Sequence, residues 1–283
     1  MMNVGVSVPL PAYLVDVGLM AKKAEELGFE SFWCAEHPCM PVHSTSRFPG
    51  SADGVIPESY SHFVDPFVAL ARASGMTSRI KLATGIVLVP ERHPILLAKE
   101  VSTLDLFSGG RFMFGIGAGW HREETALMGG DFDHRWTQTR ESVLAMKELW
   151  TKAEAAWQGH YYQFPAVRSY PKPKQQPHPP VLLGGAAKTV LQRIVSWGDG
   201  WLPNRVTPEQ LRESRATLDR LAKDAGRDPS KITISVYGQP PDRDLIKRLH
   251  DAGATRVVVR PPVAKTDAEM AAGLTQIAEA VLK

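Results

Sequence analysis

The stretch VGLMAKKAEELGFESFWCA, residues 17–35, contains the repeating unit that decides the fold of this chain. Its apolar residues recur at the spacing of one face of an α-helix, at Val17, Met20, Ala21, Ala24 and Leu27. Gly28 follows as the residue type that often ends a helix, and the largely apolar run at residues 31–35 has the length of a buried strand. The stretch therefore predicts a helix, a glycine C-cap and a strand, in that order.

The same order of helix, glycine and strand recurs along the chain. Gly253 precedes the apolar run at residues 255–259, and Gly198 precedes the run at residues 199–202. Together such units predict eight strands, near residues 3–8, 31–35, 80–88, 111–117, 180–184, 199–202, 231–236 and 255–259. Buried strands that alternate with helices form parallel sheets with right-handed crossovers. We therefore expect an α/β protein, a (β/α)8 TIM barrel that forms a single domain over residues 1–283.

Two helix starts agree with this arrangement. Asp65 is followed by Pro66, and Thr207 is followed by Pro208 and then by Gln210. An N-cap side chain before a proline is typical of the first helical turn, and Thr207 with Gln210 has the spacing of a capping box. Both starts fall between expected strands.

Length and composition are those of one large barrel, which fills about 250 residues. Of the 283 residues, 43% are apolar and 22% are charged, a balance that excludes disorder. The net charge of +3 is too small for a nucleic-acid-binding surface. The longest apolar run, around residues 86–89, is too short for a membrane span, and no secretory signal is expected at the start. Two cysteines give no disulfide framework, which favours a cytoplasmic protein.

Two long segments depart from the regular unit. Residues 38–62, rich in Pro, Ser and Gly, follow the second expected strand, and the proline-dense residues 157–180 precede the fifth. Loops of this length in a compact domain commonly act as lids or walls of a site. The first segment leaves the C-terminal end of a strand, where barrel enzymes carry their chemistry. The second is equally well read as a crossover strapped to the barrel.

Glu36 and His37 end the second expected strand, at the same face. Histidine exchanges protons near neutral pH, so His37 is a candidate general acid or base with Glu36 beside it. The alternative is a loop histidine with a structural hydrogen bond. Cys34, Cys39 and His43 lie nearby, but their spacing matches no tetrahedral zinc motif, and no metal is expected.

Glycines mark three further strand ends. Gly85 lies inside the third expected strand, which indicates a bulge, a close approach to a ligand, or packing against a large neighbour. Gly115, Gly117 and Gly119 leave the fourth strand without the spacing of a dinucleotide fingerprint. Residues 184–187 lead from the fifth strand into a helix and are the preferred phosphate-binding loop.

Together these motifs resemble those of the bacterial luciferase-like superfamily of flavin and deazaflavin oxidoreductases, most closely its F420-dependent branch. The resemblance covers essentially the whole chain. It rests on Val4-Gly5-Val6, Glu36-His37, Ala83-Thr84-Gly85-Ile86, Gly117-Ala118-Gly119-Trp120 with Glu123-Glu124, Pro171-Lys172-Pro173 and Leu183-Gly184-Gly185. The order and spacing of these motifs are specific for the superfamily and less so for the cofactor.

The resemblance implies a pocket for a tricyclic ring at the C-terminal face of the barrel. Gly85 and Ile86 would be joined by a cis peptide bond that backs the ring. Glu36 and His37 would lie against the deazaflavin, with His37 exchanging the proton coupled to hydride transfer. The ring and ribityl chain would be lined by Gly117, Ala118, Gly119 and Trp120, and the phosphate would be held by Gly184, Gly185 and Ala186. Relatives with sugar-phosphate substrates carry a carboxylate where this chain has Trp120, which favours a more apolar substrate.

The resemblance thus predicts a coenzyme F420-dependent oxidoreductase that transfers a hydride between the deazaflavin and a small organic substrate. An FMN-dependent monooxygenase that uses reduced flavin and O2, and a flavin- or deazaflavin-binding protein without turnover, stay open as alternatives. A lyase or isomerase has thin support, because Lys81 and Lys231 begin strands rather than end them. The cations that could meet the anionic cofactor tail are Arg122, Lys188, Arg193 and Arg205. A homodimer is expected by analogy with the family.

Overall fold

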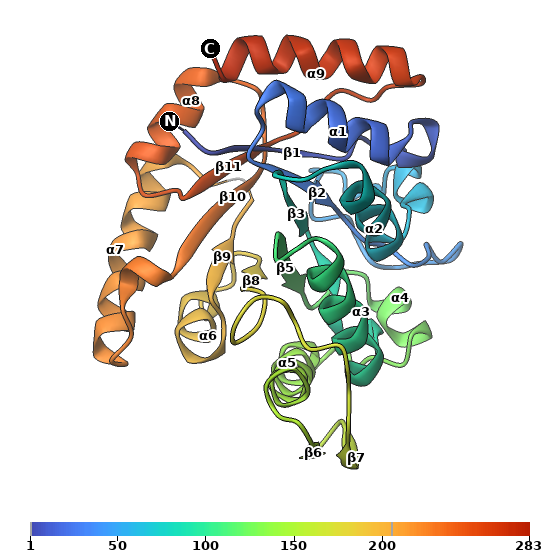
Figure 1. Ribbon diagram of the computed structural model, residues 1–283, viewed down its shortest axis with the longest axis vertical. Helices are drawn as coiled ribbons and strands as arrows, with labels where there is room; N and C mark the ends of the chain where they lie inside the picture. The colour runs from blue at the N-terminus through green and yellow to red at the C-terminus, as the bar shows by residue number, and fades with distance from the viewer. Residues whose placement is uncertain (1, 205) are drawn as a thin grey trace.

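A closed barrel of eight parallel strand positions forms the centre of the computed structural model, which describes residues 2–204 and 206–283 (Figure 1). Its strands are β1 (Val4–Ser7), β2 (Ser31–Cys34), β3 (Lys81–Thr84), β5 (Phe112–Gly117), β8 (Val181–Gly184), β9 (Gly200–Leu202), β10 (Thr233–Gln239) and β11 (Arg256–Val259), with β4 (Val87–Leu88) continuing β3. The hydrogen-bonded order runs β3-β2-β1-β11-β10-β9-β8-β5, and pairing of β3 with β5 closes the ring. The (β/α)8 architecture and the predicted strand positions are confirmed.

Helices follow the strands around the outside of the barrel (Figure 1). They are α1 (Val17–Leu27), α2 (Pro66–Met76), α3 (Pro94–Phe107), α4 (Arg122–Leu127), α5 (Arg135–Thr151), α6 (Val190–Trp197), α7 (Pro208–Asp224), α8 (Arg243–Asp251) and α9 (Asp267–Val281). The last helix, α9, packs beside the first, α1, which closes the ring of helices around the barrel. In the described part of the chain, no helix has both the length and the apolar character that crossing a membrane requires.

The helix ends form as the sequence predicts. Gly28 ends α1 with a φ of 92°, a left-handed conformation that glycine adopts without a steric penalty. The Asp65 side chain accepts hydrogen bonds from the N–H groups of Phe67 and Val68 at the start of α2. Thr207 and Gln210 form the expected capping box of α7. These caps fix the lengths of the helices that cover the barrel.

Two hydrophobic cores hold the layers together. The larger fills the space between strands and helices, and it includes the fully buried Phe32, Phe112 and Phe114. The smaller lies among the inward-facing side chains of the barrel, namely Trp33, Ala83, Met113, Leu182, Leu202 and Val258, with Ile86 and Tyr237 packed against them. The interior of the barrel is therefore filled with side chains, as in other eight-stranded α/β barrels.

The third strand position is interrupted where the sequence has Gly85. Strand β3 ends at Thr84, β4 begins at Val87, and the Gly85–Ile86 peptide bond between them is cis, as the family resemblance implies. Side chains crowd this point, since a Cβ on Gly85 would lie 2.6 Å from the Tyr237 ring and 3.1 Å from Trp33. The sequence left three explanations for Gly85 open, and the structure supports packing against large neighbouring side chains.

The proline-dense segment before β8 contains a hairpin that the sequence did not predict. Strands β6 (Ala155–Gln158) and β7 (Gln163–Val167) pair antiparallel, and Figure 1 shows them beyond the end of α5. The carboxylate of Glu141 on α5 accepts hydrogen bonds from the N–H groups of Tyr161 and Tyr162 at 2.9 and 2.8 Å. The hairpin turn is thus tied to α5.

Candidate functional site

Glu36 is buried at the C-terminal end of β2, and both of its carboxylate oxygens are engaged. One accepts a hydrogen bond from the Leu88 N–H at 2.7 Å, and the other pairs with the Arg92 guanidinium. Arg92 also pairs with Asp65 and Glu100. Burial raises the pKa of Glu36 and Arg92 opposes this shift. The residue fastens β2 to β4, next to the cis peptide bond.

His37 points its Nδ1 at Glu124 of α4, with 2.8 Å between Nδ1 and the carboxylate oxygen. Only 6% of the His37 side chain is exposed, and Glu124 is fully buried. The second oxygen of Glu124 accepts a longer hydrogen bond of 3.4 Å from the Cys39 N–H. Nε2 of His37 makes no hydrogen bond with any residue that the structure describes. A carboxylate thus fixes the tautomer and direction of a histidine whose other nitrogen is available.

Aromatic rings surround His37 on several sides. The ring centroids of Tyr60, Phe63 and Trp120 lie 5.3, 5.5 and 5.6 Å from that of His37. Phe48 contacts both Tyr60 and Trp120, at 4.9 and 5.6 Å. We call Phe48, Tyr60, Phe63 and Trp120 the aromatic cluster. Three of its members come from the segment that follows β2, so the predicted loop contributes the wall of this site.

The loop is pinned to the start of α4 by one carboxylate. Glu123 accepts hydrogen bonds from the Thr45 N–H and hydroxyl, both at 2.7 Å, and from the Ser46 hydroxyl at 2.6 Å. These bonds hold the pKa of Glu123 well below its usual range. The buried His121 caps α4 through its Nδ1 and meets Ser44 through its Nε2, at 2.9 Å. The segment 44–46 is therefore fixed next to Trp120.

Two of the glycines singled out in the sequence, Gly117 and Gly184, lie against the side chain of Ile86. A Cβ on Gly117 would overlap the Ile86 side chain, and one on Gly184 would lie 3.1 Å from it. Strand ends β4, β5 and β8 thus meet around the cis Gly85–Ile86 bond. Ala118, the residue after β5, is also buried. The structure brings together the residues predicted to line the ring.

Gly119 and Gly185 both have left-handed backbones, with φ of 80° and 97°. The carbonyl of Gly119 accepts a hydrogen bond of 3.1 Å from Arg135, and that of Gly185 accepts one of 2.8 Å from the Trp201 indole. Ala186 lies in the exposed turn that leads to α6. The predicted phosphate loop, residues 184–187, is therefore an open turn, and the helix that follows it, α6, begins only at Val190.

The cations expected at the cofactor tail differ in availability. Arg122 is paired with Asp133 at 2.6 Å and stacks on Phe132. Arg193 on α6 stacks on Trp136, and its buried Nη1 has no hydrogen-bond partner. Lys188 is exposed, and Arg205 lies outside the described residues. Of the three cations that the structure describes, Arg193 combines burial with an unused donor, which is what an incoming anion requires.

Glu91 adds an acid that the sequence analysis missed. Its side chain follows β4, is 3% exposed, and accepts a hydrogen bond of 3.0 Å from the Thr125 hydroxyl through one oxygen. The other oxygen is buried without a partner. Burial and the nearby charge of Glu124 raise the pKa of Glu91 to about 8. The charge of the neighbouring Arg92 opposes this shift only in part, so the carboxyl is held in its neutral form at neutral pH.

The partners of His37 also escaped the sequence analysis. Glu124 was part of a quoted motif, but its pairing with a residue 87 positions away appears only when α4 packs beside β2. No group of three or more His, Cys, Asp or Glu side chains in residues 2–204 and 206–283 could hold a metal ion.

The family assignment follows from the sequence itself. The family model described as luciferase-like monooxygenase matches residues 5–242. The chain belongs to the luciferase-like monooxygenase family. The match spans the barrel from β1 to the end of β10, and so contains every site residue described above.

Several known proteins resemble the chain over most of its length. An uncharacterized protein of Mycobacterium tuberculosis is 36% identical over 253 residues, which cover 87% of each chain. The crystal structure of monooxygenase RslO1 from Streptomyces bottropensis has a TM-score of 0.81 at 21% identity, covering 99% of each chain. The coenzyme F420-dependent tetrahydromethanopterin reductase from Methanopyrus kandleri has a TM-score of 0.76 at 18% identity, covering 99% of this chain and 98% of that one. The two structural matches share the fold.

Proposed function

We propose that this luciferase-like protein is a coenzyme F420-dependent oxidoreductase that transfers a hydride between the deazaflavin and a small organic substrate. The observation that carries the proposal is the buried His37–Glu124 pair, set between the aromatic cluster and the glycine-lined strand ends. Both an F420-dependent reductase and a monooxygenase share this fold.

The residues at the C-terminal face fit such a cofactor. Gly85, Ile86, Gly117, Ala118 and Gly119 would contact the ring and ribityl chain, because they lie at the neighbouring ends of β3, β4 and β5 on the C-terminal face. Gly184, Gly185 and Ala186 would hold the phosphate in the open turn before α6. The unpartnered Arg193 donor suits the anionic tail. When bound, the deazaflavin supplies the hydride.

The protein's own chemistry centres on one proton. Nδ1 of His37 is held by Glu124, so Nε2 faces the aromatic cluster and can give or take the proton that accompanies hydride transfer. Glu36 was expected beside His37 as a catalytic partner. We propose that it is a positioning residue instead, because its oxygens already hold Leu88 and Arg92.

The substrate class follows from the side chains around His37. Tyr60, Phe63 and Trp120 place aromatic rings around the His37 ring. An apolar or aromatic alcohol, ketone or enone would be desolvated here at little cost, whereas a sugar phosphate would not. The half-buried Trp120 therefore favours the apolar substrate.

An anaerobic titration tests the cofactor. Purified protein is titrated with deazaflavin and, separately, with FMN, and the change in cofactor fluorescence is recorded. We expect saturable binding of the deazaflavin at micromolar concentration and at least about tenfold weaker binding of FMN. Tight binding of FMN with none of the deazaflavin would overturn the proposal.

The second candidate is an FMN-dependent monooxygenase, favoured by the family name and by the similarity to RslO1. It predicts that the protein consumes O2 when supplied with reduced FMN and an apolar substrate. The F420-dependent function predicts no such consumption above the rate of free reduced flavin. We further propose a homodimer, which light scattering of the purified protein would test.

A further inference from the structure

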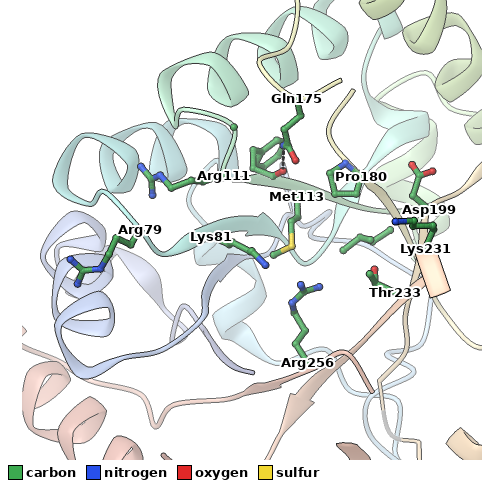
Figure 2. Close-up of a pocket in the computed structure, with 13 residues that line it drawn as sticks. Arg79, Lys81, Arg111, Met113, Gln175, Pro180, Asp199, Lys231, Thr233 and Arg256 are labelled. Atoms are coloured by element: carbon green, nitrogen blue, oxygen red, sulfur yellow. Dashed lines mark hydrogen bonds between the residues drawn. The ribbon is translucent and has the colours of Figure 1, made fainter. Parts of the chain in front are cut away.

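A cavity of about 340 Å³ opens at the N-terminal end of the barrel, on the face opposite His37 (Figure 2). Its walls are residues at or just before strand starts, such as Lys81 of β3, Arg111 before β5 and Arg256 of β11. Its floor is apolar, formed by the buried Met113 and Leu182. The proposed reaction uses no residue at this end.

Cations dominate the lining. Asp199 is the one carboxylate among the lining residues that the structure describes, and the cations are Arg79, Lys81, Arg111, Lys231 and Arg256. Figure 2 shows Lys81 and Arg256 directed toward Met113 from two strands, with Lys231 on the side of Asp199. Positive charge therefore converges on one small hollow.

The surrounding carboxylates do not balance this charge. Glu30 pairs with both Lys81, at 2.8 Å, and Arg256, at 3.1 Å, so one anion serves two cations. Asp199 accepts a hydrogen bond of 2.9 Å from the Val181 N–H. Lys231 and Asp199 form no ion pair, and no side-chain hydrogen bond of Lys231 is present in residues 2–204 and 206–283.

Arg111 adds to the excess of positive charge in the cavity. Its guanidinium donates to neutral oxygens, including the carbonyls of Ile80 and Ser108 at 2.7 Å each. Hydrogen bonds to carbonyls fix the direction of the group, and the charge of Glu25 acts on Arg111 without forming an ion pair with it in the described part of the chain. A set of fixed cations around an apolar floor is what an oxyanion with an organic substituent would need.

We propose that this cavity binds a small organic phosphate. A phosphate monoester carries up to two negative charges and three acceptor oxygens, which match donors arriving from several strands. The cavity exceeds the roughly 30 Å³ share of one water by about tenfold, so it has room for a substituent beyond the phosphate. Met113 and Leu182 would pack against that substituent.

Phenyl phosphate is a suitable probe, with inorganic phosphate and benzoate as comparisons. Isothermal titration calorimetry at low salt is expected to give one phenyl phosphate per chain at this site. Binding should be tighter than for inorganic phosphate, because the ring meets the apolar floor, and tighter than for benzoate, which carries one charge. It should weaken as salt is raised.

Charge variants of Lys231 locate the probe. We expect Lys231→Gln to weaken the binding of phenyl phosphate about fivefold, because it removes one positive charge from the cavity. Lys231→Glu should weaken binding about 20-fold, because it also adds a negative charge. The matched controls are Lys265→Gln and Lys265→Glu, at an exposed lysine that does not line the cavity. Lys231 is itself exposed, so the variants should fold, and their circular dichroism and melting temperatures check this.

Either of two results would overturn the proposal. Absence of binding at millimolar probe would do so, as would binding that is equally strong in the Lys231 and Lys265 variants, since the probe would then lie elsewhere, for instance at the aromatic cluster. Neither result bears on F420 dependence, which the fluorescence titration tests by itself.

Discussion

His37 is held by one carboxylate and faced by three rings, and this arrangement leaves Nε2 as its reactive atom. Replacing His37 by Ala should slow hydride transfer about 10²- to 10⁴-fold, the usual contribution of a positioned acid or base. Cofactor affinity should stay within a few-fold, because the strand-end glycines rather than His37 are proposed to hold the cofactor. Stopped-flow absorbance with the best substrate from a panel of apolar alcohols and ketones measures the rate.

The matched control for this prediction is His160→Ala, at a histidine in the β6–β7 turn. It should leave both the rate and the affinity unchanged. A His37→Ala protein that still transfers hydride at the parent rate would remove His37 from the mechanism.

Glu91 should make stability depend on pH. Its pKa is about 8 in the folded protein against an ordinary value of 4.5, so between these values the folded chain keeps a proton that the unfolded chain has lost. The stabilisation is complete below pH 4.5 and declines as pH rises toward 8, by at most about 1.4 kcal/mol per pH unit. Glu91→Gln mimics the neutral acid and should lack this slope.

Urea unfolding of both proteins at several pH values measures the difference. The free energy of unfolding of the parent, relative to that of Glu91→Gln, should fall from pH 5 to pH 8 and level off above. Parallel pH profiles for the two proteins would show that Glu91 is ionised in the fold, contrary to the burial of its unpartnered oxygen.

At the scale of single residues, the sequence predicts positions better than partners. Glu36, His37 and the glycines were found because each ends a strand, and strand ends of a barrel face one site. The contacts of Glu124 and Glu91 depend on how α4 packs against the strands, which no local pattern encodes. The burial of Glu36 against Arg92 likewise needed the fold.

Among the elements, the segment 38–62 contributes Phe48 and Tyr60 to the wall of the candidate site. Its fixed point is Glu123, whose half-buried carboxylate binds Thr45 and Ser46. Glu123→Ala should release residues 44–46 and with them the wall that carries Phe48 and Tyr60. We expect faster hydrogen exchange in this segment and a KM for apolar substrates raised about three- to tenfold, with kcat changed less.

Glu154→Ala is the control for this element, because Glu154 is an exposed carboxylate that pairs with Arg168 far along the chain from the segment. It should not alter exchange in residues 38–62. If Glu123→Ala exchanges no faster there than Glu154→Ala does, the segment is held by its packing on Trp120 rather than by the carboxylate.

Helices and strands were predicted correctly where the signal lies in a few neighbouring residues, and they were missed where it depends on residues far along the chain. Helix caps such as Asp65 and Thr207 carry their own signal, and the strands are apolar runs between glycines. Strands β6 and β7 were missed because the segment reads as proline-rich, and because their turn is held by Glu141 of a separate helix. A single domain over residues 1–283, a cytoplasmic location and a dimer stay predictions.

For the whole molecule, the two proposed sites lie at opposite ends of one barrel that is filled by Trp33, Met113, Leu182 and their neighbours. A ligand that binds only the folded chain raises the free energy of unfolding by RT ln(1 + [L]/Kd). If the deazaflavin occupies the C-terminal face and phenyl phosphate the N-terminal cavity, their contributions should add. The rise in melting temperature with both ligands should then equal the sum of the separate rises, within about 1 °C for shifts of a few degrees. A combined rise no larger than the greater single one would mean that the ligands compete for one site. Lys231→Glu would then show which end of the barrel that site occupies, because it should reduce the rise given by a ligand only if that ligand binds in the N-terminal cavity.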